Sequence, residues 1–300
     1  MGEAGATGRQ KTIVGVIGGT GLYELPGLVQ VEQINVDTPF GAPSSPITRG
    51  LLDGVEFLFL SRHAPGHVLL PSEINYRANI FALKLLGAQW CISVSAVGSL
   101  REEIAPGDIV LPEQLIDRTR GRSSTFFGNG IVAHIPFADP FCPTLNNVLR
   151  ETALSLSREQ QFRVHTEATY VVMEGPAFST RAESHLYRSW GASIIGMTGL
   201  PEAKLAREAE LSYAVLAMST DYDCWRSETA DVDVPDLLET MQRNVVTAKA
   251  VLRAAAPRLL ASTPSLLAAN ALQHAIITDP AVIPAEVKEK LSPLIGRYIN

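Results

Sequence analysis

Residues capable of chemistry follow six short apolar runs in this sequence of 300 residues. The runs cover 12–17, 55–60, 91–94, 170–173, 194–197 and 213–218, and they end in GGTG, SRH, SAVGS, EGP, TG and STDYD. Short runs rich in β-branched residues are typical of strands that are buried on both faces. Ligands bind outside the carboxyl ends of strands in open parallel sheets, so the six ends are predicted to form one site.

Glycine turns and hydroxyl side chains at three of these ends favour an anion site. Backbone N–H groups of a glycine turn can converge on an oxyanion, and Thr20, Ser95 and Thr198 add hydroxyls. The GGTG turn alone is weak support, because such turns are common structural features. It lacks the third glycine of a dinucleotide-binding turn, since Glu24 stands there, and the sequence has no GK[ST] of a Walker loop.

Arg62 and His63 follow the second run and extend the same anion site. A guanidinium group can form a bidentate pair of hydrogen bonds with two phosphate oxygens. A histidine ring can donate a hydrogen bond to phosphate or to a sugar hydroxyl. An arginine at a strand end is also often paired with a surface carboxylate. The sequence leaves both interpretations of Arg62 open.

Asp221 and Asp223 stand two residues apart at the end of the sixth run, where strand periodicity points both side chains the same way. Paired carboxyl groups serve acid–base catalysis, metal binding or recognition of amine donors, or they form a polar turn. No cluster of ligand spacing supports a metal. A carboxyl group facing a heterocycle with a ring nitrogen and an exocyclic amine accounts for both residues.

Met197 and Phe178 are apolar residues near two of the strand ends, where they can pack against a sugar and a base. Either one alone is more often a core residue. Together with the anion site and the carboxyl pair, they describe a phosphate, a sugar and a base in a row. The sequence therefore indicates a nucleoside and inorganic phosphate as ligands.

Stretches of helical period alternate with the apolar runs, which predicts an α/β fold with a mixed, largely parallel sheet flanked by helices. The predicted helices cover 75–86, 144–156, 180–190, 201–210 and 236–260. Residues 112–140 lack a clear period and are interpreted as a loop. One domain is expected over 1–300, with a core at about 12–261 and a C-terminal extension at 262–300.

The overall composition narrows the class of protein. The chain is 46% hydrophobic and 19% charged, and 25 Lys and Arg against 31 Asp and Glu give a net charge of −6, which argues against nucleic acid as a partner. The amino-terminal segment does not resemble a secretory signal, and no apolar stretch is long enough to span a bilayer. A cytoplasmic location without membrane association is expected. The three cysteines indicate neither disulfides nor a zinc site.

Long co-linear motifs add a resemblance to these inferences. They are VGVIGGTGLYELPG, VDTPFGAPS, FLSRHAPGHVLLPSEINYRANIFALKLLGA, GSLREEIAPGDIVLPEQLIDRTRGR, HIPFADPFCP, YVVMEGPAFSTRAESHLYRSWGASIIGMTGLPEAKLAREAEL and STDYDCW. From about Val14 to Ala261 the chain resembles the trimeric purine nucleoside phosphorylase family, in its branch that cleaves methylthioadenosine. The resemblance implies phosphorolysis to adenine and 5-methylthioribose 1-phosphate in purine and methionine salvage. It also implies a homotrimer, with inorganic phosphate as co-substrate and no cofactor or metal.

The family pattern also implies a role for each site residue. The phosphate shell comprises Thr20, Arg62, His63, Ser95, Ala96 and Thr198. Met197 is expected against the ribose, Phe178 against the base, and Asp221 and Asp223 as the catalytic residues and purine readers. His134 resembles a histidine given to the neighbouring subunit's 5′-substituent pocket, which Val234 and Leu237 would line.

Two glycines depart from the family pattern, and three alternatives stay open. Gly196 and Gly199 stand where the family usually has larger residues, so the sugar pocket is expected to be looser. A phosphorylase of 6-oxopurine nucleosides or of methylthioinosine would share the phosphate shell, but its purine site would not favour two aspartates. A non-catalytic nucleoside-binding protein and a nucleoside hydrolase are rivals from other classes, and neither needs the full phosphate shell.

Overall fold

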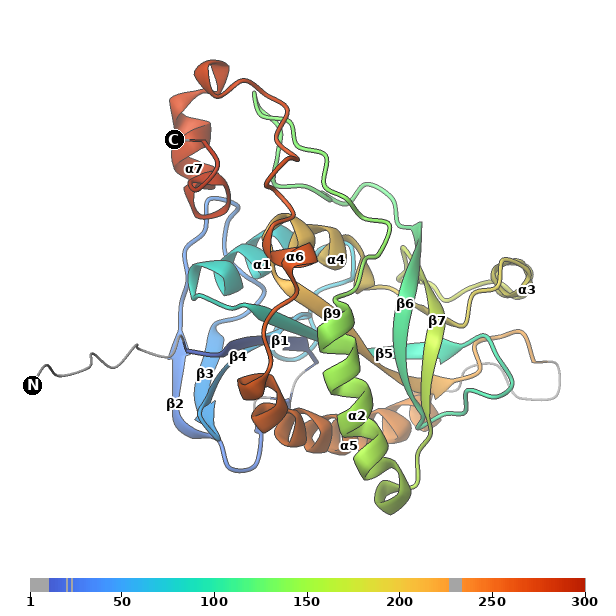
Figure 1. Ribbon diagram of the computed structural model, residues 1–300. Coiled ribbons are helices and arrows are strands. Elements are labelled where there is room, and N and C mark those ends of the chain that lie inside the picture. Colours follow the sequence, from blue (N-terminus) through green and yellow to red (C-terminus); the bar gives the residue numbers. More distant parts are fainter. Residues whose placement is uncertain (1–10, 20, 23, 227–233, 300) are drawn as a thin grey trace, which may run out of the picture.

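The computed structural model describes residues 11–19, 21–22, 24–226 and 234–299, with the side chains of 234–238 left out. The chain forms one nine-stranded sheet with helices on both faces (Figure 1). The predicted fold class is confirmed. Each of the six predicted strands is present, as β1 (Ile13–Gly18), β4 (Val55–Ser61), β5 (Trp90–Ser99), β7 (Val164–Met173), β8 (Ile194–Gly196) and β9 (Ser212–Asp221).

Three further strands complete the sheet, and the sequence pattern did not reveal them. They are β2 (Val29–Ile34), β3 (Ile47–Leu52) and β6 (Ile109–Arg118). Strand β6 shows that the interpretation of residues 112–140 as a loop was wrong for its first part. The strand order is β2-β3-β4-β1-β5-β8-β7-β6-β9, and β9 also pairs with β5, so the last five strands close into a ring.

Strand direction explains how the predicted ends meet. Strands β4, β1, β5 and β9 run parallel, so their carboxyl ends lie at one edge. Strand β8 instead runs antiparallel to β5 and pairs only with its last residues, Gly98 and Ser99. The end of β8, and that of its parallel neighbour β7, therefore point in the direction opposite to the end of β5.

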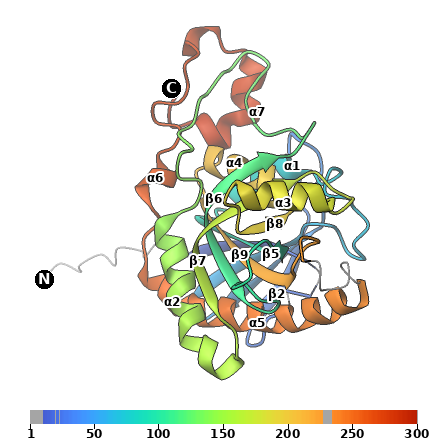
Figure 2. The ribbon, with the colours of Figure 1, turned by 90° about the vertical axis from the view of Figure 1, so that its right-hand side faces the viewer.

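Two pairs of helices cover the sheet and form two parts of the core. Helices α1 (Tyr76–Leu85) and α4 (Gly199–Glu208) contact each other on one face, and α2 (Pro143–Gln160) and α5 (Val234–Ala261) do so on the other (Figures 1 and 2). Helix α3 (Arg181–Ser189) begins with the predicted capping box, in which Thr180 and Glu183 satisfy each other's backbone N–H groups. These helices fix the strand ends between them.

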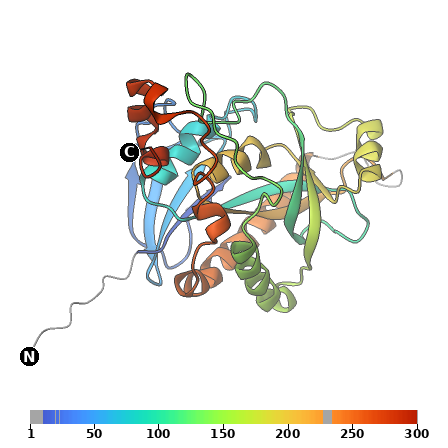
Figure 3. The same ribbon diagram turned by 45° about the horizontal axis from the view of Figure 1, so that its top comes forward.

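The C-terminal extension folds back over the body in α6 (Leu266–Ala269), the 3₁₀ helix η1 (Pro280–Val282) and α7 (Ala285–Ile295). It lies beside the segment 119–142 that joins β6 to α2 (Figures 1 and 3). The backbone N–H of His134 donates to the Ala275 carbonyl at 2.8 Å, and that of Ile277 donates to the Val132 carbonyl at 3.1 Å. The extension thus supports the segment that carries His134. No helix within the described ranges is long and apolar enough to cross a membrane.

Candidate active site

A buried ion pair stands at the centre of the strand ends. The side chains of Arg62, after β4, and Glu202, in α4, are only 3% and 1% exposed, and Arg62 Nε lies 3.0 Å from Glu202 Oε2. The Tyr213 hydroxyl donates to Glu202 Oε1 at 2.9 Å. Burial lowers the pKa of Arg62, but the attraction of Glu202 outweighs burial and the pKa is raised. The pair therefore stays charged and joins β4, α4 and β9.

Arg62 also ties together the ends of β1 and β5. Its Nη2 donates to the Ser93 hydroxyl at 2.6 Å and to the Ile17 carbonyl at 3.3 Å, while Nη1 donates to the Val94 carbonyl at 3.3 Å. The predicted cation is thus present, but Glu202 already balances its charge. Among the described residues, one Nη1–H group of Arg62 is left without an acceptor and can serve an anion.

His63 is half-buried and takes one definite tautomer. Its Nδ1 lies 2.8 Å from the Leu69 carbonyl, which only accepts, so Nδ1 carries the proton. Burial lowers the pKa of His63 to about 4, with a smaller contribution from the Arg62 charge, although the Leu69 contact acts in the opposite direction. The ring is therefore neutral at neutral pH, and its Nε2 is an acceptor.

The remaining members of the predicted phosphate shell come from β5 and the start of α4. Ser95 is buried with its hydroxyl 3.3 Å from the Ser93 hydroxyl, and Ala96 next to it is exposed. Thr198 is the residue before α4, and its side chain makes no capping hydrogen bond there, so its hydroxyl can serve a ligand. Thr20 lies outside the described residues.

Asp221 and Asp223 form a compact carboxyl pair at the end of β9. Asp221 Oδ1 accepts from the Asp223 backbone N–H at 2.7 Å, and Oδ2 accepts from the Thr220 hydroxyl at 2.7 Å. Burial raises the pKa of both aspartates, and the Asp221 charge adds to the effect on Asp223. Either group can therefore be protonated at a higher pH than an ordinary aspartate.

Gly98 brings this carboxyl pair next to the end of β8. A Cβ atom placed on Gly98 would lie 3.0 Å from Asp221 Oδ1 and 3.1 Å from Cγ2 of Ile195. On the other side of β8, a Cβ on Gly175 would lie 2.5 Å from the Met197 sulfur. Met197 thus packs on the turn after β7, at Gly175. Phe178, three residues further along the same turn, is 54% exposed and available to a ligand.

Gly196 and Gly199 do not leave an empty space. The ring of Tyr170, which is fully buried, occupies it: a Cβ on Gly196 would lie 2.5 Å from the Tyr170 hydroxyl, and one on Gly199 would lie 2.6 Å from the ring. The expectation of a looser sugar pocket is therefore wrong as far as it rests on these glycines. Tyr170 packs against the glycines on both sides of Met197 and Thr198 and so supports this turn.

Of the residues predicted for the 5′ pocket, His134 has a described side chain. His134 is exposed on the segment 119–142, as a residue presented to a neighbouring subunit would be. The side chains of Val234 and Leu237 lie outside the described residues.

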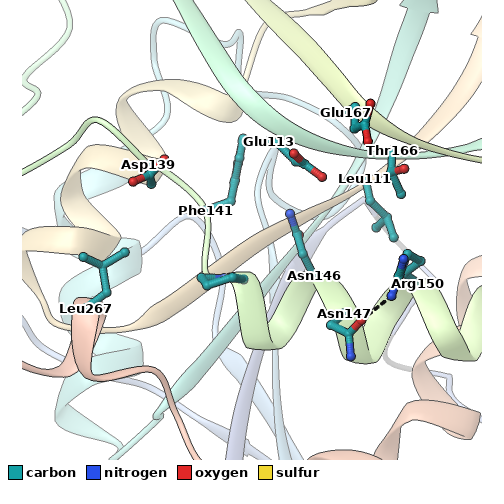
Figure 4. A pocket seen from close by; sticks show the side chains of 11 residues that line it. Leu111, Glu113, Asp139, Phe141, Asn146, Asn147, Arg150, Thr166, Glu167 and Leu267 are labelled. Atoms are coloured by element: carbon teal, nitrogen blue, oxygen red, sulfur yellow. Dashed lines mark hydrogen bonds between the residues drawn. The ribbon is translucent and has the colours of Figure 1, made fainter.

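One cavity lies elsewhere and is lined by none of the predicted residues. It has a volume of about 380 Å³ and is lined by Leu111, Glu113, Asp139, Phe141, Pro143, Asn146, Asn147, Arg150, Thr166, Glu167 and Leu267 (Figure 4). Three carboxylates stand there against one cation, Arg150, which already donates to Asn147 at 2.6 Å. This lining disfavours an anion, so the strand ends remain the candidate site.

No metal-binding group of three His, Cys, Asp or Glu residues occurs in the described part of the chain.

Sequence reasoning missed two charged residues of the site, Glu202 and Arg122. Glu202 follows Pro201 in the first turn of α4, where acidic residues are common. The one signal for its role is that a buried Arg62 needs a counter-ion. Arg122 lies in the segment interpreted as a loop, which offered no pattern.

This fold and site define a nucleoside-type phosphorylase architecture, and residues 13–257 match the family model of the phosphorylase superfamily. The chain belongs to that superfamily. It is 56% identical over 96% of its length to S-methyl-5′-thioadenosine phosphorylase of Geobacter sulfurreducens, of which 99% is covered, and 52% identical over 95% to the enzyme of the same name from Thermosynechococcus vestitus, again with 99% covered.

Solved structures agree with these relatives. The chain matches a methylthioadenosine phosphorylase from an antarctic soil metagenomic library with a TM-score of 0.89 at 44% identity, covering 95% of this chain and 99% of that one. Methylthioadenosine phosphorylase from Schistosoma mansoni, in complex with adenine, gives a TM-score of 0.79 at 39% identity over 84% and 93% of the two chains.

We predict that Gly196→Ala destabilises the protein through Tyr170. The added methyl group overlaps the Tyr170 hydroxyl, and overpacking of this kind costs about 1–3 kcal/mol. Tyr170→Phe removes that hydroxyl and with it the overlap, so it should recover part of the loss in the double variant. Urea unfolding of the two single variants and the double variant measures the coupling; purely additive effects would show that the contact is unimportant.

Proposed function

We propose that the protein catalyses the phosphorolysis of S-methyl-5′-thioadenosine, giving adenine and 5-methylthioribose 1-phosphate. The observation that carries this proposal is the carboxyl pair at the strand ends, formed by the half-buried Asp221 and the buried Asp223, whose pKa values burial raises. It occurs in a chain about half identical to enzymes of that name over nearly its whole length. Phosphate is a co-substrate in this reaction, and the proposal calls for no cofactor.

The carboxyl pair supplies a proton to the leaving base. Cleavage of the glycosidic bond builds negative charge on the purine, and a neutral acid at N7 stabilises that charge in the transition state. Burial keeps Asp221 protonated to higher pH, as this role needs. Two aspartates also suit the 6-amino group of adenine, whereas an ionised carboxylate would repel the 6-oxo group of hypoxanthine.

Phosphate is held at the end of the site away from the base, by dipoles and one cationic N–H group of Arg62. Glu202 balances the Arg62 charge, so the Ser95 and Thr198 hydroxyls and backbone N–H groups contribute most of the donors. The neutral His63 ring accepts a hydrogen bond from the P–OH group of monohydrogen phosphate on Nε2, so the phosphate keeps its proton and remains a dianion. The bound dianion then lies below the sugar, where it stabilises the positive charge that develops on the ribose.

The decisive assay offers the purified protein four nucleosides, each with and without inorganic phosphate, and follows release of the base. We expect methylthioadenosine to be preferred over adenosine, methylthioinosine and inosine, and release to depend on phosphate. Release without phosphate would indicate a hydrolase, and a preference for inosine or methylthioinosine would indicate the 6-oxopurine alternative. Binding without any turnover would indicate a nucleoside-binding protein.

Asp221→Asn tests the acid. We expect kcat on methylthioadenosine to fall about 10²–10⁴-fold, as for loss of a general acid, and the preference over methylthioinosine to narrow, because an amide can satisfy a 6-oxo group. Wild-type activity should fall as the pH rises through the raised pKa of Asp221, and this alkaline decline should vanish in the variant. Asp37→Asn, on an exposed carboxylate, is the control. An unchanged substrate ratio and pH profile would remove Asp221 from purine recognition.

We also propose a cytoplasmic homotrimer in which His134 completes the 5′ pocket of the neighbouring subunit, with Val234 and Leu237 on the other wall. The exposure of His134 on a segment braced by the C-terminal extension supports this arrangement.

His134→Ala should raise KM for methylthioadenosine more than for adenosine, because the two nucleosides differ only in the 5′ substituent. Light scattering should still report a trimer. His185→Ala, at another exposed histidine, is the control. Equal changes for both nucleosides, or a monomeric wild-type protein, would contradict the shared site.

A further inference from the structure

Arg122 lies on the segment after β6, and its side chain reaches the backbone that follows β7 and β8. Its side chain is only 3% exposed. The guanidinium contacts the turn after β7 and the turn between β8 and α4, the two turns that carry Phe178 and the Met197–Thr198 pair.

Five hydrogen bonds join this guanidinium to the rest of the protein. Nη1 donates to the carbonyls of Met197 at 2.6 Å and Leu200 at 2.9 Å, and to the Tyr76 hydroxyl at 3.1 Å. Nη2 donates to the Glu174 carbonyl at 2.6 Å, and Nε donates to Glu174 Oε2 at 3.0 Å. The two Nη1 hydrogens are thus shared among three acceptors, and one N–H of Nη2 has no acceptor among the described residues. Because the side chain is almost completely buried, its contacts are with protein carbonyls and carboxylate rather than with solvent.

The turn that Arg122 contacts is not held by regular helical geometry. Thr198 has φ −126° and ψ −10°, and Leu200 has φ −124° and ψ 141°, so the backbone of 198–200 departs from a helix. The Met197 and Leu200 carbonyls flank that departure. A buried guanidinium bonded to both carbonyls fixes their separation and hence the direction of the side chains between them.

We propose that Arg122 is a positioning residue that sets the Met197–Thr198 turn for phosphate and ribose while touching neither. This inference rests on the proposed function for the identity of the ligands. Because Arg122 joins Glu174 to the same turn, it also fixes the distance between the wall that bears Phe178 and the wall that bears Met197. A lysine cannot replace it, since its three tetrahedral donors cannot serve carbonyls on both turns.

The test compares Arg122→Lys and Arg122→Ala with Arg120→Lys and Arg120→Ala, since Arg120 is exposed two residues away. Titration calorimetry measures phosphate and adenine binding directly, without turnover. We expect both Arg122 variants to bind phosphate about 10- to 100-fold more weakly and to lose kcat by a similar factor, the scale of a displacement of about 1 Å in a site. Adenine binding should fall less than phosphate binding, because the two aspartates that read the base lie at the end of β9, and only Phe178 lies on a turn that Arg122 contacts.

Added guanidinium ion should restore part of kcat in Arg122→Ala, by filling the space that the side chain leaves, and not in Arg122→Lys. Phosphate affinity within about twofold of wild type in both Arg122 variants would overturn the proposal. Parallel losses of phosphate binding, adenine binding and thermal stability would also overturn it, because they would show a general structural role. A wild-type protein that binds both ligands without phosphorolysis would contradict the proposed function but not this assignment.

Discussion

The ion pair of Arg62 and Glu202 is the interaction on which the site depends. It joins residues 140 positions apart in a place closed to water, and it binds the ends of β1, β4 and β5 to α4 through one guanidinium. A buried charge without its partner is strongly unfavourable, and breaking such a pair costs about 3–5 kcal/mol. The strand ends can therefore be displaced only at a cost comparable to a large part of the stability of a domain.

Neutralising Arg62 also decides how the site can attract phosphate. The chain carries a net charge of −6, and its main cation at the strand ends already has a counter-ion. Affinity for an anion must therefore come from oriented dipoles at short range, such as backbone N–H groups and the Ser95 and Thr198 hydroxyls. Such donors act only at correct distances, which explains why so many contacts of the structure fix the backbone of the turns rather than touch a ligand.

The strands that position the site could be predicted because they are buried on both faces and read as apolar runs. Strand β2 escaped prediction because it lies at an edge and five of its six residues are exposed, and β6 because Pro112 interrupts its pattern where the register with β7 shifts. Asp221, Asp223 and His63 could be found from their place after strands. Glu202 and Arg122 could not, because their importance lies in distant partners: Arg62 is 140 residues from Glu202, and the partners of Arg122 are 46 to 78 residues away. Only the three-dimensional structure shows which distant residues these two side chains contact.

Gly196 and Gly199 show why a missing side chain in a sequence does not mean a cavity in the structure. The two glycines suggest room beside the sugar, yet Tyr170 from β7 fills it completely. Close packing is the rule in protein interiors, so a small residue at one position implies a large one opposite. Here the large residue is a rigid ring below the Met197–Thr198 turn, and Arg122 holds the same turn through its carbonyls. A turn fixed from two sides presents its hydroxyl in one direction, as short-range dipolar binding of phosphate requires.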